Sequence, residues 1–190
     1  MRASSPALTQ PPVSSKAHKS RILVVDADEA RARDIASQLA QLRYDPVGLA
    51  TRGTEAIALA GELRPDLVLM NIELAGDMDG ITAAQVIRTQ FALPVVLLTA
   101  YAEEGTLARA VHAEPFGYII KPFSPRELHV VLELALFKHK AEARLLASEE
   151  EYRLLFEGML DGFALHEIVC DAAGRPVDYR FLSVNPASNG

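Results

Sequence analysis

Four polar residues of complementary chemistry come at the ends of four short apolar runs. In order along the chain, Asp26 follows Ile22–Val25, Asn71 follows Leu67–Met70, Thr99 follows Val95–Leu98 and Lys121 follows Phe116–Ile120. One such residue alone would mean little, because any buried strand must end in something polar. An acid, an amide, a hydroxyl and an amine in this series instead favour a shared site, with Asp26 as its anion and Lys121 as its cation.

The elements that must position these residues can be predicted from the hydrophobic pattern. The four runs, with a weaker one at Pro46–Ala50, are four or five residues long and suit parallel strands buried on both faces. Between them, apolar residues recur at helical spacing, as in Ile35, Leu39 and Leu42. Weaker helical stripes include the one at Leu107, Ala110 and Val111. Five strands alternating with five helices predict a doubly wound α/β fold, in which ligands bind beyond the carboxyl ends of the strands.

Composition limits the class of protein. The 190 residues are 49% hydrophobic and 23% charged, which suits a chain with one real core and an incomplete second unit. The net charge of -6 argues against a nucleic-acid partner. Cys170 is the single cysteine, so no intrachain disulfide can form. We expect a cytoplasmic chain without a membrane span, whose residues 1–20, rich in Ser, Pro and Lys, form a disordered tail.

The chain from about Arg21 to Leu136 resembles the receiver (CheY-like) domains of two-component response regulators. The resemblance rests on the motifs ILVVDADEA, PDLVLMNIELAGDMDGI, PVVLLTAY and GYIIKPF, each at its expected strand end. It implies a flavodoxin-like sheet in the order 2-1-3-4-5 and a pocket that receives phosphate from a histidine kinase. It also implies magnesium bound by two acids after the first strand, an acceptor aspartate after the third, and a cis Lys121-Pro122 bond.

When the motifs are matched residue by residue, the resemblance implies a role for each of four residues. Asp26 is the first acid, Thr99 the switch hydroxyl, Tyr118 the switch aromatic and Lys121 the phosphate-pocket lysine. Two positions depart from the pattern, since Ala27 stands where the second acid is expected and Asn71 where the acceptor is expected. A carboxamide is a very poor nucleophile, so we expect no phosphorylation of Asn71.

The same departures predict weak magnesium binding at most, with no metal site beyond the residual Asp26, and no other cofactor. Magnesium prefers hard, anionic oxygens, and two of three expected negative charges are lost. We therefore expect a nearly neutral pocket, closed by a direct ion pair between Asp26 and Lys121.

Other acids near the site have simpler interpretations. Asp28 lies one residue past the expected ligand position, and we predict that it caps the first helix ahead of Arg31. Asp77 and Asp79 lie in the loop Gly76–Gly80 and are expected to be solvated rather than substitute acceptors. For Tyr118, simple packing within the fifth strand stays an alternative to the switch role.

The helix that begins after Ser124 is longer than a receiver needs. The sequence Ser124-Pro125-Arg126-Glu127 is a capping box with proline at the first helical position, and neither Pro nor Gly follows before Gly158. A coiled-coil seam is indicated by the spacing of Val131, Leu134, Lys138, Ala141, Leu145, Ser148 and Tyr152. A homodimer through this helix is the preferred interpretation, and a solvated connector is the alternative.

The remaining residues resemble the opening of a PAS sensor domain, with a short helix, a strand, a turn at Asp171–Arg175 and a strand ending in Asn185-Pro186. Only one hairpin is present, so no complete sensor pocket is expected. The predicted divisions are a tail (1–20), a receiver domain (21–137), a helical linker (138–150) and a partial PAS domain (151–190).

We therefore predict a non-enzymatic pseudo-receiver in two-component signalling, which acts through protein partners, either a histidine kinase or an output domain, and through dimerisation. Two alternatives stay open. Asp26-Ala27-Asp28 also looks like the D-x-D pair of haloacid-dehalogenase-type phosphatases, although no acidic metal-binding motif follows Lys121. The chain could also be a purely structural dimerisation module.

Overall fold

The computed structural model describes residues 19–100, 115–158, 161–172 and 174–189 and divides into two compact units, Met1–Leu136 and Phe137–Gly190. The predicted tail lies almost wholly outside the described residues, and so does the helical stripe of Leu107, Ala110 and Val111. Within the described ranges, none of the helices has both the length and the apolar composition that crossing a membrane requires.

The first unit is built on a parallel sheet of five strands in the order β2-β1-β3-β4-β5, which confirms the predicted fold. The strands are β1 (Arg21–Val25), β2 (Asp45–Ala50), β3 (Leu67–Asn71), β4 (Val95–Thr99) and β5 (Gly117–Ile120). Asn71 and Thr99, expected just after their strands, are the last residues within them. The carboxyl ends of neighbouring strands therefore present these two side chains at one edge.

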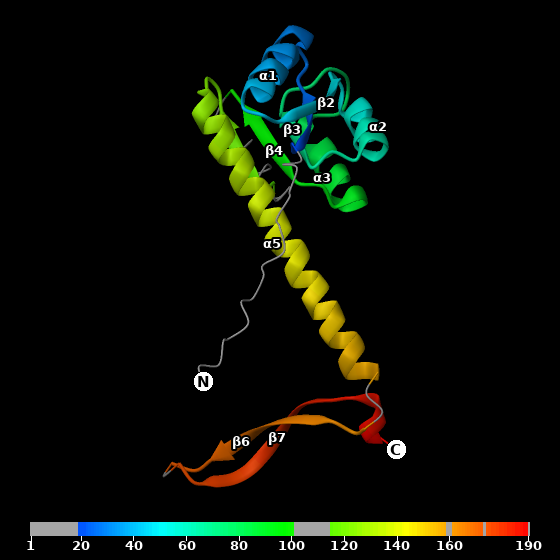
Figure 1. Cartoon of the computed structure of the whole chain (residues 1–190), viewed down its shortest axis with the longest axis vertical. Coiled ribbons are helices and arrows are strands. Elements are labelled where there is room, and N and C mark those ends of the chain that lie inside the picture. The colour runs from blue at the N-terminus through cyan, green and yellow to red at the C-terminus, as the bar shows by residue number, and fades with distance from the viewer. Residues whose placement is uncertain (1–18, 101–114, 159–160, 173, 190) are drawn as a thin grey trace, which may run out of the picture. The chain divides into compact units, whose positions relative to one another are not determined.

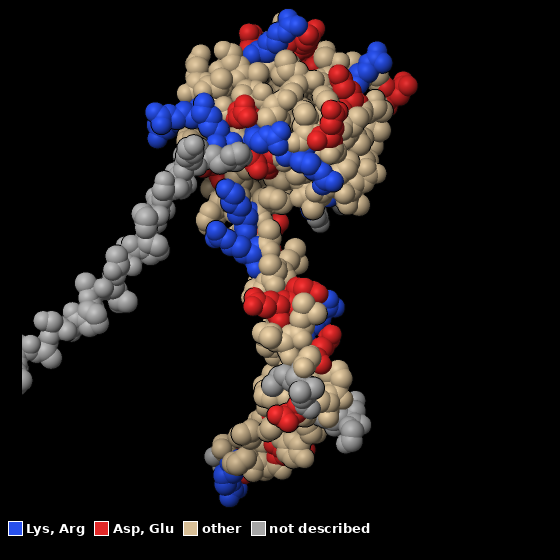
Figure 2. Space-filling model, turned by 45° about the vertical axis from the view of Figure 1, so that its right-hand side comes forward, with Lys and Arg blue, Asp and Glu red and all other residues tan. Residues whose placement is uncertain are grey.

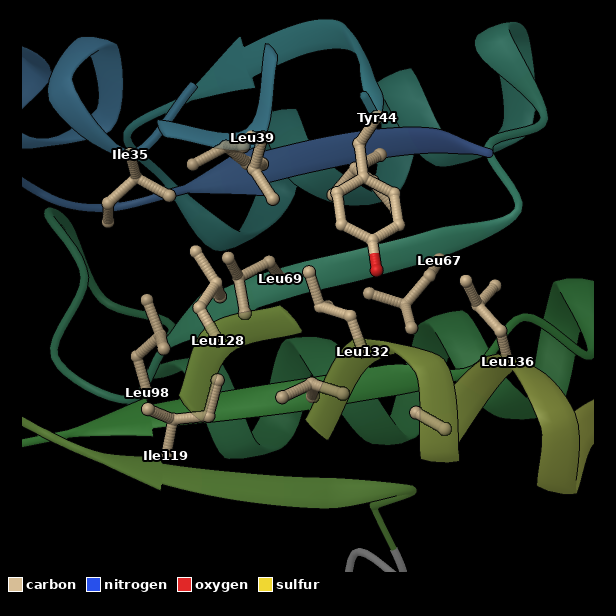
Figure 3. Packing of buried hydrophobic residues seen from close by; sticks show 14 of the residues in the cluster. Ile35, Leu39, Tyr44, Leu67, Leu69, Leu98, Ile119, Leu128, Leu132 and Leu136 are labelled. Carbon is tan, nitrogen blue, oxygen red and sulfur yellow. The ribbon is translucent and has the colours of Figure 1, made fainter. Parts of the chain in front are cut away.

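Helices cover both faces of this sheet (Figure 1). Their bounds are α1 (Glu29–Gln41), α2 (Gly53–Leu63), α3 (Gly80–Phe91) and α5 (Pro125–Gly158). Because successive side chains of a strand point to opposite faces, Ile22 and Val24 pack toward α1 and α5, whereas Leu23 and Val25 pack toward α2 and α3. Figure 3 shows the first of these layers, where Leu128, Leu132 and Leu136 of α5 lie against the sheet.

At Gly80, the start of α3 lies against the backbone at the end of β3. The Gly80 amide donates to the carbonyl of Ile72 at 2.8 Å. A Cβ atom on Gly80 would lie 2.1 Å from the carbonyl oxygen of Asn71. Only glycine therefore lets the helix sit this near to the strand that carries Asn71.

The long helix α5 begins with the capping box predicted from the sequence. The amide and hydroxyl of Ser124 donate to Glu127 Oε2 at 2.7 and 2.8 Å, and the Glu127 amide donates to the Ser124 hydroxyl at 3.2 Å. These hydrogen bonds with Ser124 lower the pKa of Glu127 below its ordinary value. At 34 residues the helix is about 50 Å long.

Only the first three turns of α5 bury apolar side chains, namely Leu128, Leu132, Ala135 and Leu136. The placement of Val131 on the predicted coiled-coil seam is wrong, because this side chain packs against the sheet-facing cluster of the first unit. Beyond Leu136, the apolar side chains Phe137, Leu145, Leu146, Tyr152, Leu154 and Leu155 are exposed. Along this part of the helix, uncharged surface alternates with acidic and basic side chains (Figure 2).

The second unit contains a two-stranded antiparallel hairpin, β6 (Ala164–Cys170) and β7 (Pro176–Val184), as the sequence predicts. The turn is closed by Asp171, whose amide donates to the carbonyl of Arg175 at 2.8 Å, and by Gly174 at a φ of +74°. The buried side chain of Asn185 accepts from the Phe163 amide at 2.7 Å and donates to the Asp161 carbonyl at 2.9 Å. The short helix expected after residue 151 is the final part of α5.

Candidate functional site

Asp26 is the centre of the polar edge. It follows β1, its side chain has no solvent exposure, and its amide donates to the Ala50 carbonyl at 3.1 Å. Lys121 Nζ donates to Asp26 Oδ2 at 2.8 Å, and the Asp28 amide donates to Oδ1 at 3.0 Å. The direct ion pair expected between Asp26 and Lys121 is therefore confirmed.

The carboxyl ends of β4 and β5 hold Lys121 in place. Its amide donates to the carbonyl of Thr99 at 2.7 Å, and the Lys121-Pro122 peptide bond is cis, as expected from the resemblance. The Lys121 side chain is 16% exposed, so its pair with Asp26 is shielded from water and from salt. Thr99 itself is 8% exposed and belongs to the same edge.

Asn71 completes this edge from β3, between the two neighbouring strands. It is 5% exposed, and its Nδ2 donates to the carbonyl of Glu73 at 2.9 Å. The amino group of the Asn71 side chain therefore points toward the loop that follows β3. The structure brings Asp26, Asn71, Thr99 and Lys121 to one edge of the sheet, as the four-residue pattern predicts.

The start of α1 adds two charged groups to the site. Asp28 is the N-cap of α1, as predicted, and its Oδ1 accepts from the amides of Ala30 at 2.9 Å and Arg31 at 3.3 Å. Arg31 Nε lies 3.5 Å from both Asp26 Oδ1 and Asp28 Oδ2. Ala27 is exposed between the two acids and offers no side-chain ligand.

These side chains do not fit the magnesium ion that the resemblance implies. Both oxygens of Asp26 already accept hydrogen bonds, Ala27 has no side-chain oxygen to offer, and Asn71 is neutral. Among the residues that the structure describes, no group of three His, Cys, Asp or Glu side chains could hold a metal ion. The arrangement is a closed ion pair with a capping acid beside it.

Comparison with known proteins identifies the family. The family model for the response regulator receiver domain matches residues 22–133. This chain belongs to the response regulator receiver family. The transcriptional regulatory protein PdtaR of Mycobacterium tuberculosis is 34% identical over 157 residues, which cover 79% of this chain and 76% of PdtaR. The regulatory protein AtoC of Escherichia coli is 39% identical, over 61% of this chain but only 25% of AtoC.

Two solved structures resemble the receiver unit in both sequence and fold. The signal receiver domain of a modulated diguanylate cyclase from Desulfovibrio desulfuricans is 34% identical with a TM-score of 0.63, over 66% of this chain and 99% of that one. The N-terminal domain of a response regulator/sensory box/GGDEF protein from Carboxydothermus hydrogenoformans is 34% identical with a TM-score of 0.59, over 65% and 98%. Residues 22–133 therefore form a receiver module of two-component signalling, and receiver domains are signalling modules rather than enzymes.

The remaining candidates lie near the site but outside its ion pair. Tyr118 lies in β5, partly buried against the α2 and α3 side of the core, and burial raises its pKa. Its switch role stays a prediction. Asp77 is exposed, as expected, whereas Asp79 is not simply solvated: it is the N-cap of α3 and accepts from the Thr82 amide at 2.8 Å.

Sequence reasoning missed a polar contact that fastens α5 to the receiver core. The buried hydroxyl of Tyr44 donates to Glu133 Oε1 at 2.7 Å and lies 2.9 Å from His129 Nδ1. Burial first, and then the hydrogen bond and charge of Glu133, raise the pKa of Tyr44 well above its ordinary value. Spacing could have shown that His129 and Glu133 share a helix face, but not that Tyr44 faces them.

Proposed function

We propose that this chain is a pseudo-receiver: it keeps the receiver scaffold but takes no phosphoryl group, and it acts through protein contacts. The observation that carries the proposal is Asn71 at the end of β3, where the resemblance places the acceptor aspartate. A carboxamide oxygen cannot form the acyl phosphate that a carboxylate forms. The ion pair of Asp26 and Lys121 supports a pocket held in one charge state without a metal.

Phosphorylation of the whole chain tests this proposal. The chain is incubated with a small phosphodonor and magnesium, with an active receiver domain in the same reaction as a reagent control, and both are analysed by intact mass spectrometry. We expect the control to gain the mass of a phosphoryl group and this chain to gain none. A stable adduct on the peptide that contains Asn71, Asp77 or Asp79 would contradict the proposal.

The second part of the proposal is a homodimer through α5. Leu134, Leu145 and Tyr152 are exposed at 62%, 61% and 62% and fall on one heptad seam, which Leu155 continues at 66%. Exposed apolar side chains at this spacing are typical of a helix that pairs with another copy. Lys138 and Ser148 at seam positions weaken the packing without excluding it, since polar seam residues also set register and orientation.

The third part concerns the second unit, which we propose is the start of a PAS-type sensor domain. The receiver from Carboxydothermus hydrogenoformans is described as part of a response regulator/sensory box/GGDEF protein, so a receiver and a sensory box occur in one protein of that bacterium. A hairpin alone is marginally stable, and the apolar side chains of β6 and β7 are largely exposed. The division into a receiver domain (21–137), a helical linker (138–150) and a partial PAS domain (151–190) is part of this proposal.

Partners and compartment follow as proposals. A histidine kinase or an output domain remains the proposed protein partner, rather than a nucleic acid, because the chain carries a net charge of -6. The free thiol of Cys170 is exposed and suits a reducing compartment, so we propose the cytoplasm. The phosphatase alternative is not favoured, since the chain belongs to the receiver family and Asp26 is buried in an ion pair.

A further inference from the structure

Arg31 occupies a position for which the family resemblance gives no role. It lies in the first turn of α1, and its Nε atom is 3.5 Å from one oxygen of Asp26 and 3.5 Å from one oxygen of Asp28. A cation that bridges two carboxylates at the end of β1 stands close to where the resemblance places the metal. The guanidinium is always charged at the pH of a cell, so this cation is permanent.

The two carboxylates and their two cations form a balanced set. Lys121 pairs with Oδ2 of Asp26, and Arg31 lies near Oδ1 of the same carboxylate. Asp28 faces Arg31 with its Oδ2 atom, whereas its Oδ1 atom caps the helix. Two negative charges thus face two positive ones, around a carboxylate that has no exposure to water. A divalent cation entering here would add uncompensated positive charge next to Arg31 and Lys121.

We propose that Arg31 is the built-in cation of this pocket and excludes a divalent metal ion from Asp26 and Asp28. The inference deepens the proposed function, on which it rests, because it explains how a receiver pocket without its phosphoryl chemistry keeps a stable arrangement of charges. Arg31 acts here in addition to the ligands lost at Ala27 and Asn71: its charge, placed beside two carboxylates, further disfavours an ion from solution at Asp26 and Asp28.

Removing this one charge is therefore expected to strengthen the weak metal binding at Asp26 and Asp28. In Arg31→Gln, Asp26 Oδ1 and Asp28 Oδ2 lose their shared cation while Asp28 Oδ1 can still cap the helix. Mg²⁺ keeps several waters and is usually held by one or two carboxylates together with phosphate oxygens, so Asp26 and Asp28 alone are expected to give a weak site, and the change in its affinity is what the test measures. Arg31→Lys keeps a positive charge at the same place and is expected to bind metal as weakly as the wild type.

The test is a Mn²⁺ titration of the full chain, with free Mn²⁺ followed by electron paramagnetic resonance and Mg²⁺ as the competitor. Arg33→Gln is the matched control, because Arg33 lies on the same helix, changes net charge equally and pairs with exposed Glu29. We expect Arg31→Gln to bind Mn²⁺ about tenfold more tightly than Arg33→Gln, Arg31→Lys and the wild type. Adding Asp26→Asn to Arg31→Gln is expected to abolish the gain.

The inference is overturned if Arg31→Gln and Arg33→Gln bind Mn²⁺ equally, if Arg31→Lys binds as tightly as Arg31→Gln, or if the gain survives Asp26→Asn. Each of these results can occur while the wild-type chain still takes no phosphoryl group. A phosphorylated wild type would instead overturn the proposed function, whatever the metal titrations show. The two failures are thus distinguishable.

Discussion

The carboxyl edge of the sheet and the distal part of α5 are built in opposite ways. At the edge, the buried side chain of Asp26 is paired with the largely buried side chain of Lys121. Among the described residues, Gln38 Oε1 in α1 is the single buried side-chain oxygen or nitrogen without a partner, and it lies away from this edge. Along α5 after Leu136, large apolar side chains are exposed. The polar edge is closed by contacts within the receiver unit, whereas the helix presents surface that another molecule can cover. Substitutions should therefore change stability and chemistry at the edge, and association along the helix.

The largest expected effect is a gain of chemistry at the edge. The double substitution Asn71→Asp with Ala27→Asp should restore magnesium binding and phosphorylation, because Asp26, Thr99 and Lys121 are already in place and the two added carboxylates outweigh the positive charge of Arg31 and Lys121. Asn71→Asp alone should recover less, since the nucleophile returns while the metal still lacks an anionic ligand. The measurements are magnesium titration by calorimetry and phosphorylation by mass spectrometry on the three proteins.

Two further readouts sharpen this rescue experiment. Without metal, the double variant should unfold at lower urea concentration than the wild type, because crowded carboxylates repel one another. Magnesium should reverse that loss. A double variant that folds but binds no magnesium and takes no phosphoryl group would mean that the edge residues do not converge as a receiver pocket.

The second prediction concerns the buried ion pair. Lys121→Ala leaves the fully buried Asp26 without its closest cation and should lower the free energy of unfolding by about 3 to 5 kcal/mol. The matched control is Lys138→Ala on α5, whose pair with Glu142 is exposed and should contribute less than about 0.5 kcal/mol. Urea unfolding of both variants measures the difference, and equal losses would contradict the contrast between edge and helix.

The sequence predicted the edge better than it predicted the helix surface, and the reasons are physical. Strands buried on both faces read as unbroken apolar runs, so the positions of Asp26 and Asn71 at their ends were visible in advance. The roles of Asp28 and Ser124 were equally visible, because helix caps depend on neighbouring residues. Contacts made by long side chains across the fold were not visible, so Tyr44 against Glu133 was missed. Val131 was assigned to the wrong surface because spacing alone does not show which face of α5 packs against the sheet.

The third prediction tests the association of α5. Leu145→Glu places a charge on the proposed seam and should weaken self-association by about tenfold or more, or about 1.4 kcal/mol. Leu146→Glu is the matched control, since Leu146 is the adjacent leucine, is similarly exposed and lies off the seam. Sedimentation equilibrium measures both. A wild-type chain that is monomeric at high concentration, or equal effects of the two substitutions, would remove the dimer from the proposal.

The smallest expected effect lies where α5 is fastened to the receiver core. Tyr44→Phe removes the hydroxyl that contacts Glu133 and His129, and it should lower the free energy of unfolding by about 1 kcal/mol at neutral pH, because the two exposed partners regain water. The pKa of Tyr44 is raised in the folded state, so its contribution is fully present below the unfolded pKa of about 10 and is lost as the pH rises above it. The difference between wild type and Tyr44→Phe in urea unfolding should therefore be constant from pH 7 to 9 and shrink above about pH 10. A difference that stays constant or grows above pH 10 would mean that folding does not raise the pKa of Tyr44, and it would contradict the role of its hydroxyl as a buried donor to Glu133.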